Sequence, residues 1–206
     1  MRALSALIAL TLTLPGCSAL SALSGGPALD VFELLPHTDA PLTCGRGRVA
    51  ELVVELPKTR STLDSDRIMI RPSTLQTQYL PDAKWGDTVP VSVQNLLVQS
   101  FGRYDAFTHV GRAPLGSSGD YALISEIGDF NAEVQGKGAL IRLSVDAQLV
   151  RESDARVVSR GRFVTQGVSP STRTADLVPA FDAAAQDLTR QITDWGTGAL
   201  GIRACR

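Results

Sequence analysis

The residue with the clearest chemistry in this sequence is Cys17, one of three cysteines in a chain of 206 residues. A cysteine thiolate is a nucleophile, so such a side chain can be acylated or alkylated, form a disulfide or bind a metal. Cys17 follows an apolar run over residues 3–14, which is shorter than the roughly 20 residues that a transmembrane helix needs. Arg2 precedes this run and small residues follow it. This layout is typical of a bacterial secretory signal.

The residues Leu14-Pro15-Gly16-Cys17 resemble the lipobox of bacterial lipoproteins. That pattern has Leu, then a small residue, then Gly or Ala before the cysteine; Leu14 and Gly16 match it and Pro15 departs from it. The resemblance implies cleavage before Cys17 and a covalent lipid on its sulfur. Ser18 stands where an Asp tends to retain Gram-negative lipoproteins at the inner membrane, so the resemblance also implies the periplasmic face of the outer membrane. The alternative is an ordinary secreted protein with an incidental cysteine.

The segment after Cys17 is dense in Ser, Gly and Pro and lacks hydrophobic periodicity, which predicts a flexible tether. Fully extended, residues 18–29 reach at most about 40 Å. The expected organisation is therefore a lipoprotein signal over residues 1–16, a tether over 17–30 and one domain over 31–206. The remaining length suffices for a single domain with a hydrophobic core.

The charge balance excludes one large class of partner. The chain has 20 Lys and Arg residues against 21 Asp and Glu residues, a formal net charge of −1. A nucleic-acid-binding domain usually has a strongly basic surface. We therefore expect no nucleic acid among the partners.

The other two cysteines, Cys44 and Cys205, form an even pair if Cys17 carries lipid. In an oxidising compartment such a pair predicts a disulfide, which in the chain-entropy model stabilises the fold by roughly 4–5 kcal/mol. The alternative is two unrelated thiols. His37 and His109 lie far from both cysteines without metal-ligand spacing. We therefore expect no metal site, and no cofactor apart from the covalent lipid.

Hydrophobic patterning predicts the elements of the domain. Strands are expected where Val, Leu and Ile are dense or alternate with polar residues. These segments are residues 48–57, 67–72, 74–80, 107–110, 121–134, 138–150 and 156–166. In the segment 74–80, Leu75, Thr77 and Tyr79 are expected on one face. In the segment 121–134, Ile124 and Phe130 share one parity, and Gly128 is expected to mark a bulge.

Two segments have helical spacing. Residues 89–101 place Val89, Val93, Leu97 and Phe101 on one face, with Asp87 or Thr88 as the cap and Gly102 as the end. The second helix is expected after a capping Asp176, which would put Pro179 at its third position, and it extends to Trp195. Helices on one face of a mixed, mostly antiparallel sheet give an α+β fold.

No catalytic motif is apparent. Asp64 and Asp66 precede a predicted strand, and surface carboxylates fit that position better than an acid–base pair. The sequence has no G-x-S-x-G nucleophile motif and no complete phosphate-binding loop. We therefore do not expect an enzyme.

Residues 63–101 resemble the ABC-type transport auxiliary lipoproteins, which include the paraquat-inducible protein C type, and the resemblance runs from the lipobox through about Trp195. The matching features are an R-I-x-x-R strand, a Tyr-Leu pair, an Ala-x-Trp motif, an I-x-D-F strand and an Ala-rich last helix ending in Trp. In this chain they are Arg67, Ile68, Arg71, Tyr79, Leu80, Ala83, Trp85, Ile127-Gly128-Asp129-Phe130 and residues 183–195. Departures are Val89 and Val93, where the family prefers Leu, and the additional cysteine pair.

The resemblance implies an accessory component of a lipid transport system, with an inner-membrane permease, an ATPase and an MCE-domain protein as partners, and self-association into a homo-oligomer. Trp85, Tyr79 and Phe130 are the candidate residues for partner contact or for packing. For Trp85, packing of the loop before the first helix onto the sheet competes with contact to lipid.

Three other functions remain open from the sequence alone. The protein could carry phospholipid directly in an apolar pocket between helices and sheet. It could be an outer-membrane assembly lipoprotein resembling the lipopolysaccharide-assembly lipoproteins, with a barrel partner. It could also be an unrecognised enzyme using Asp64, Asp66 and His109.

Overall fold

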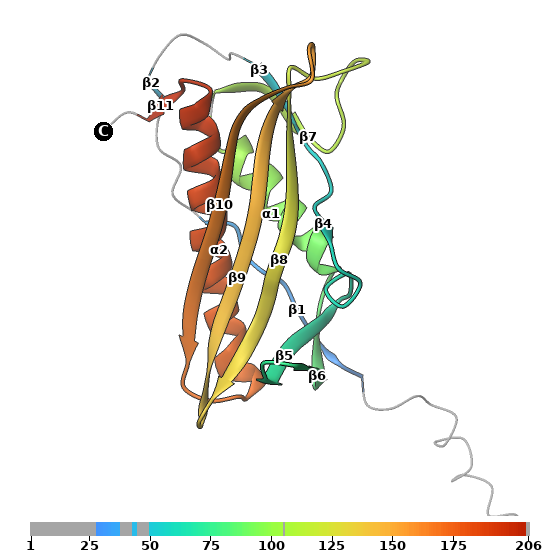
Figure 1. Cartoon of the computed structure of the whole chain (residues 1–206), viewed down its shortest axis with the longest axis vertical. Helices are drawn as coiled ribbons and strands as arrows, with labels where there is room; N and C mark the ends of the chain where they lie inside the picture. The colour runs from blue at the N-terminus through green and yellow to red at the C-terminus, as the bar shows by residue number, and fades with distance from the viewer. Residues whose placement is uncertain (1–27, 38–42, 45–49, 105, 205–206) are drawn as a thin grey trace, which may run out of the picture.

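Three long strands and two helices dominate the computed structural model, which describes residues 28–37, 43–44, 50–104 and 106–204 (Figure 1). The strands β8 (Tyr121–Gln135), β9 (Gly138–Arg151) and β10 (Arg156–Ser169) form two successive antiparallel hairpins. The helices α1 (Val89–Gly102) and α2 (Thr174–Ala199) lie behind this sheet, on one of its faces. The predicted α+β fold class is confirmed.

The sheet is organised around β8. One edge of β8 pairs with β9 along its whole length. Its other edge pairs in parallel with three short strands in turn, β3 (Ala50–Val54), β4 (Lys58–Thr59) and β5 (Arg67–Ser73). Beyond these, β6 (Gln76–Trp85) pairs antiparallel with β5, and β7 (Phe107–Gly111) pairs in parallel with β3. The sheet is therefore mixed, as predicted.

Strand β9 shows why the long strands form. Its alternate apolar side chains are fully buried against the helices, because successive side chains of a strand point to opposite faces. These residues are Ile141, Leu143, Val145, Ala147 and Leu149. The intervening side chains lie on the face that no helix covers, which we call the open face. Residues 152–155 join β9 to β10 as a tight turn.

A bulge in β8 overturns the predicted alignment of Ile124 with Phe130. The pairing register with β9 shifts between Ile127 and Asp129, so Gly128 marks a bulge as expected. One extra residue inverts the alternation. Ile127 and Phe130 are therefore both buried, at 2% and 1% exposure, whereas Ile124 lies on the open face opposite Gln148.

The first helix begins and ends close to its predicted bounds, with Thr88 at its N-cap and Pro90 in the first turn. The second begins earlier than expected. Its N-cap is Arg173, so Asp176 lies within the first turn and is not the cap. Pro179 consequently lies inside the helix. Its missing N–H leaves the carbonyl of Ala175 without the intrahelical donor that an N–H would supply.

Two further predictions near the ends of strands were wrong. Leu75 lies in the β5–β6 turn and is 98% exposed, because β6 begins only at Gln76. The predicted tether over residues 17–30 overlaps strand β1 (Asp30–Phe32), which pairs in parallel with β6. Phe32 stands opposite Trp85 in that pairing, and its side chain packs against the core. The ordered domain therefore includes Asp30.

Close packing of β10 onto α2 depends on a glycine. A Cβ atom at Gly167 would lie 2.8 Å from the carbonyl oxygen of Ala180 in α2. That oxygen belongs to a helix backbone, so it cannot move aside as a flexible side chain can. We expect Gly167→Ala to lower the free energy of unfolding by about 1–3 kcal/mol, measured by urea denaturation. Gly102→Ala is the matched control, because a Cβ there meets nothing within 4 Å. A cost at Gly167 equal to that at Gly102 would contradict this packing.

Candidate functional site

Two of the three predicted partner or packing residues, Trp85 and Phe130, form an aromatic cluster with Phe181 between the sheet and α2. The ring centroid of Trp85 lies 6.2 Å from that of Phe130 and 5.4 Å from that of Phe181, and both pairs of rings meet edge to face. Phe130 and Phe181 stack at 5.8 Å. Trp85 and Phe130 are each 1% exposed and Phe181 is fully buried. These rings fill the layer between helix and sheet, so Trp85 and Phe130 act in packing.

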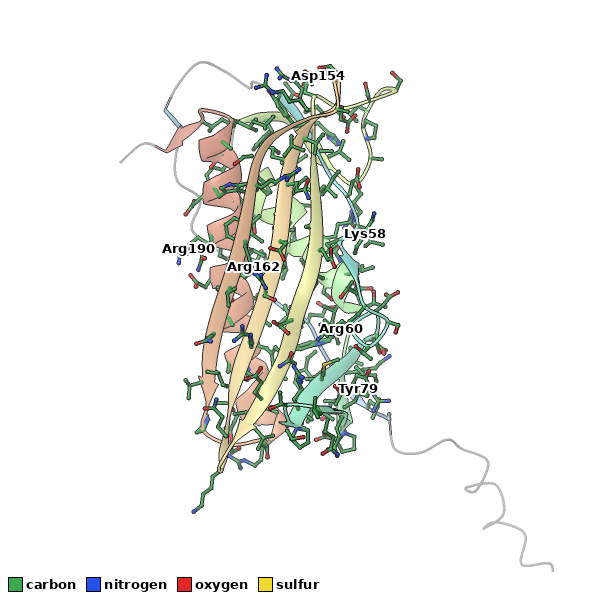
Figure 2. All side chains as sticks on the ribbon, viewed as in Figure 1. Lys58, Arg60, Tyr79, Asp154, Arg162 and Arg190 are labelled. Atoms are coloured by element: carbon green, nitrogen blue, oxygen red, sulfur yellow. The ribbon has the colours of Figure 1, made fainter. Side chains whose placement is uncertain are left out.

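Tyr79 does not join this cluster. Its ring is partly buried, its hydroxyl donates to the carbonyl of Thr62 at 2.9 Å, and the guanidinium of Arg67 lies 6.0 Å from its centroid. The hydrogen bond from Tyr79 to Thr62 joins the turn at residues 61–66 to the β5–β6 hairpin. Figure 2 labels Tyr79 and Arg60 in this region.

A polar network at the β8 bulge occupies the open face. The Asp129 carboxylate accepts hydrogen bonds from Arg142 Nε at 3.3 Å and Ser144 Oγ at 3.0 Å. Arg60 lies 3.9 Å from the other carboxylate oxygen, and its guanidinium also donates to the carbonyl of Gly128. Asp129 belongs to the I-x-D-F motif. Its side chain is only 21% exposed, so this network stabilises the bulge and joins three segments of the chain.

We expect Asp129→Ala to lower the free energy of unfolding by about 1–2 kcal/mol, because two hydrogen bonds to a partly buried carboxylate are lost. Asp146→Ala is the control. Asp146 is 58% exposed and its ion pair with Arg162 spans 3.8 Å, so its loss should cost less than about 0.5 kcal/mol. Chemical denaturation of both variants measures the difference. Equal costs would show that the bulge does not depend on Asp129.

Two ionisable groups have pKa values shifted by their surroundings. Burial, and then a 2.7 Å hydrogen bond to Asp194, raise the pKa of Tyr104 well above its usual range. The neutral phenol therefore persists as a donor that joins the end of α1 to α2. Hydrogen bonds from Ser171, and then from Arg173, lower the pKa of Asp176 in the first turn of α2. Because the folded pKa is lowered, this contribution to stability is lost as the pH falls through that pKa.

The predicted cysteine chemistry falls largely outside the described residues. Cys17, the signal and most of the tether lie there, as does Cys205. Cys44 lies in β2 (Thr43–Cys44), which pairs antiparallel with β11 (Arg203–Ala204), Cys44 standing opposite Arg203. This backbone pairing brings together the two segments to which the cysteines belong. The disulfide stays a prediction.

The disulfide can be tested by mass spectrometry of the exported protein digested without reduction. We expect one cross-linked peptide pair containing Cys44 and Cys205, because both segments belong to one small sheet. The same digest after reduction should release two separate peptides. Free thiols at both positions in the exported, unreduced protein would contradict the prediction.

The residues of the enzyme alternative are not brought together. Asp64 and Asp66 lie in the turn before β5, where Asp66 pairs with Lys84 at 2.9 Å. His109 lies in β7, which pairs with β3. Within the described part of the chain, no three His, Cys, Asp or Glu side chains form a group able to hold a metal ion. No helix of that part is both long enough and apolar enough to cross a bilayer.

The sequence profile of the ABC-type transport auxiliary lipoprotein component family matches residues 32–193. The chain belongs to this family. The matched region runs from the last residue of β1 into the last turns of α2, so it covers the long strands and both helices of this auxiliary lipoprotein.

Two solved structures are similar to this protein in fold. The crystal structure of XCC0632 from Xanthomonas campestris has 24% sequence identity and a TM-score of 0.73, covering 83% of this chain and 96% of that one. A second solved structure, of an uncharacterized protein, has 15% identity and a TM-score of 0.62 over 82% of this chain and 99% of that one. Both are similar in fold.

A relative in sequence is the uncharacterized protein bll6063 of Bradyrhizobium diazoefficiens. It is 27% identical over 150 residues, which is 71% of this chain and 39% of that protein. The auxiliary lipoprotein therefore matches well under half the length of this relative.

Sequence reasoning missed most of the network around Asp129. Asp129 was recognised as part of a motif, but Arg60, Arg142 and Ser144 were not expected to meet it. One signal for the network was present in the sequence: the alternation of β9 places Arg142 and Ser144 at its outward-facing positions. Arg60 lies in a turn, and nothing in its local pattern predicts that it reaches Gly128.

Proposed function

We propose that this auxiliary lipoprotein is a non-enzymatic docking component of an MCE-type lipid transport system. A lipid on Cys17 would hold it at the periplasmic face of the outer membrane of a Gram-negative bacterium. Its partners would be an MCE-domain protein and, through it, an inner-membrane permease and ATPase; the docking form would be a homo-oligomer. The family match over residues 32–193 is the observation that supports this proposal.

The packing between the layers favours docking over direct lipid carriage. A carrier with a pocket between helices and sheet needs space there for acyl chains. In this protein Trp85, Phe130 and Phe181 occupy part of that layer in mutual contact, and buried apolar side chains of both layers pack around them. The open face of β8, β9 and β10 is a large surface outside this packed layer. It carries polar and charged side chains suited to protein contacts.

Co-purification tests the docking role. The full-length lipidated chain, extracted in mild detergent, should retain a co-expressed MCE-domain protein through size-exclusion chromatography. The control is an unrelated lipoprotein with the same signal and tether. The absence of enrichment over this control would overturn the docking role.

Native mass spectrometry of the same preparation separates the alternatives. We expect no stoichiometric phospholipid beyond the covalent acyl chains. A bound phospholipid retained through purification would favour the carrier instead. A stable complex with a barrel protein in place of the MCE-domain protein would favour the outer-membrane assembly role.

A further inference from the structure

The outermost long strand, β10, is paired on one side only. It forms a continuous ladder with β9, from Arg156 opposite Arg151 to Ser169 opposite Ala139. Among the described residues no strand lies along its other edge. Its 14 residues contain no proline. Such an edge presents unpaired backbone N–H and C=O groups, and it is the surface to which an added strand binds.

The side chains of β10 that point to the open face combine exposed valines with arginines. Val158, Val164 and Val168 are 38%, 41% and 80% exposed. Arg160 and Arg162 lie between them and are exposed as well. β-branched residues on an edge favour pairing with another strand. Figure 2 shows Arg162 on the face of the sheet turned away from the helices.

The charged side chains of β10 are all basic. β10 carries Arg156, Arg160 and Arg162 and no acidic residue, although the whole chain has a net charge of −1. Arg162 has a single partner, Asp146, at 3.8 Å with both side chains largely exposed. Arg156 and Arg160 form no ion pair with any described residue. Arg160 therefore has no carboxylate partner among the described residues, and Arg162 is held only by an exposed ion pair, so both can bind carboxylates of a partner.

We infer that the edge of β10 binds an extended acidic segment of a protein partner by strand addition. This inference rests on the proposed docking function and specifies how the partner binds. Arg160 and Arg162 are two residues apart on one face, so the added strand needs carboxylates at alternate positions. A second copy of this chain fits poorly, because pairing two β10 edges would bring like charges together across the strands.

Hydrogen exchange with designed peptides tests the site directly. The probe is a capped ten-residue peptide of alternating Glu and Thr, added to the full-length chain in detergent. We expect slowed exchange of β10 amides and unchanged exchange in α1. A peptide of the same sequence, N-methylated at every residue, keeps its charge but has no N–H group to pair along either edge. It should bind at least tenfold more weakly. Equal binding of both peptides would reduce the effect to charge attraction and overturn strand addition.

Reversing the charge of two β10 side chains provides a second test of the site. Arg160→Glu with Arg162→Glu should weaken binding of the acidic peptide at least tenfold. The matched control is Arg190→Glu with Arg173→Glu, which changes the same charge at exposed side chains of α2 and of its N-cap. Figure 2 shows Arg190 on the helix, away from Arg162. Both double variants alter exposed side chains, and their thermal unfolding checks that they fold.

The complex with the MCE-domain protein separates this inference from the proposed function. If the wild-type chain retains that protein and the β10 variant loses it, both stand. If both chains retain it equally, docking stands and the β10 site is overturned. If neither retains it, the docking role fails while the peptide experiment still decides the site.

A third variant, Arg160→Gln with Arg162→Gln, tests whether the two arginines act only by preventing aggregation at the edge. New self-association of this variant, with peptide binding unchanged, would show that they do and would overturn the inference.

Discussion

Replacement of Trp85 by alanine is expected to lower the free energy of unfolding by about 3–5 kcal/mol, the range for removal of a large aromatic side chain from a core. Trp85 is 1% exposed and contacts Phe130 and Phe181 edge to face. Its removal leaves a cavity between α2 and the sheet that rigid backbones cannot close. Since domains are stable by about 5–15 kcal/mol, the variant should unfold at a much lower urea concentration.

Trp85→Phe refines this prediction. The indole N–H of Trp85 is buried and meets no acceptor among the described residues. A phenyl ring leaves a smaller cavity and removes that unpaired donor, so we expect a cost of about 1–2 kcal/mol. Leu75→Ala is the control, because Leu75 is 98% exposed and its truncation should change stability by less than about 0.5 kcal/mol. If Trp85→Ala were as stable as this control and yet lost partner binding, Trp85 would be a contact residue and its packing role would be wrong.

Trp85 also illustrates what the sequence could and could not reveal. The regular elements were predictable, because the apolar positions of β9 and α1 repeat with the period of a strand and of a helix and are in fact buried. The faces of β8 were not: a bulge was expected at Gly128, but its reversal of the alternation was not, and the pairing with β9 shows it. Trp85 and Phe130 were identified by their motifs, but their burial depends on Phe181 from a distant helix.

Elements without a pattern of their own were also missed. Strand β1 has three residues and exists because the edge of β6 offers it partners. The basic character of β10 is visible in the sequence, whereas its position as an edge strand is not, because strand order depends on which segments pair. The surface that we propose for partner binding therefore required the structure.

The other large expected effect concerns Cys17. We propose that its sulfur carries lipid, and each buried CH₂ of an acyl chain contributes about 0.8 kcal/mol to membrane binding. Cys17→Ala should therefore abolish incorporation of radiolabelled palmitate. Cys44→Ala is the control and should be labelled like the wild type. Palmitate on the Cys17→Ala protein, or none on the wild type, would contradict the proposed anchor.

Membrane fractionation needs a second variant, because a signal that is no longer cleaved at Cys17 can itself hold the chain in the inner membrane. Replacement of residues 1–17 by a cleavable secretory signal avoids this. We expect that protein in the soluble periplasmic fraction with unchanged thermal stability, since the first strand that the structure describes begins beyond the replaced segment, at Asp30.

Location can be separated from acylation at the next residue. In the wild-type chain Ser18 follows the cysteine, and Ser18→Asp leaves the acylated sulfur in place. We expect this variant to be labelled with palmitate as fully as the wild type but to fractionate with the inner membrane. Tethered there by at most about 40 Å of extended chain, the domain would be held at the opposite side of the periplasm from its proposed docking position. The variant should then fail to complement a deletion strain although it is folded and lipidated, and full complementation would show that the outer membrane is not where the protein acts.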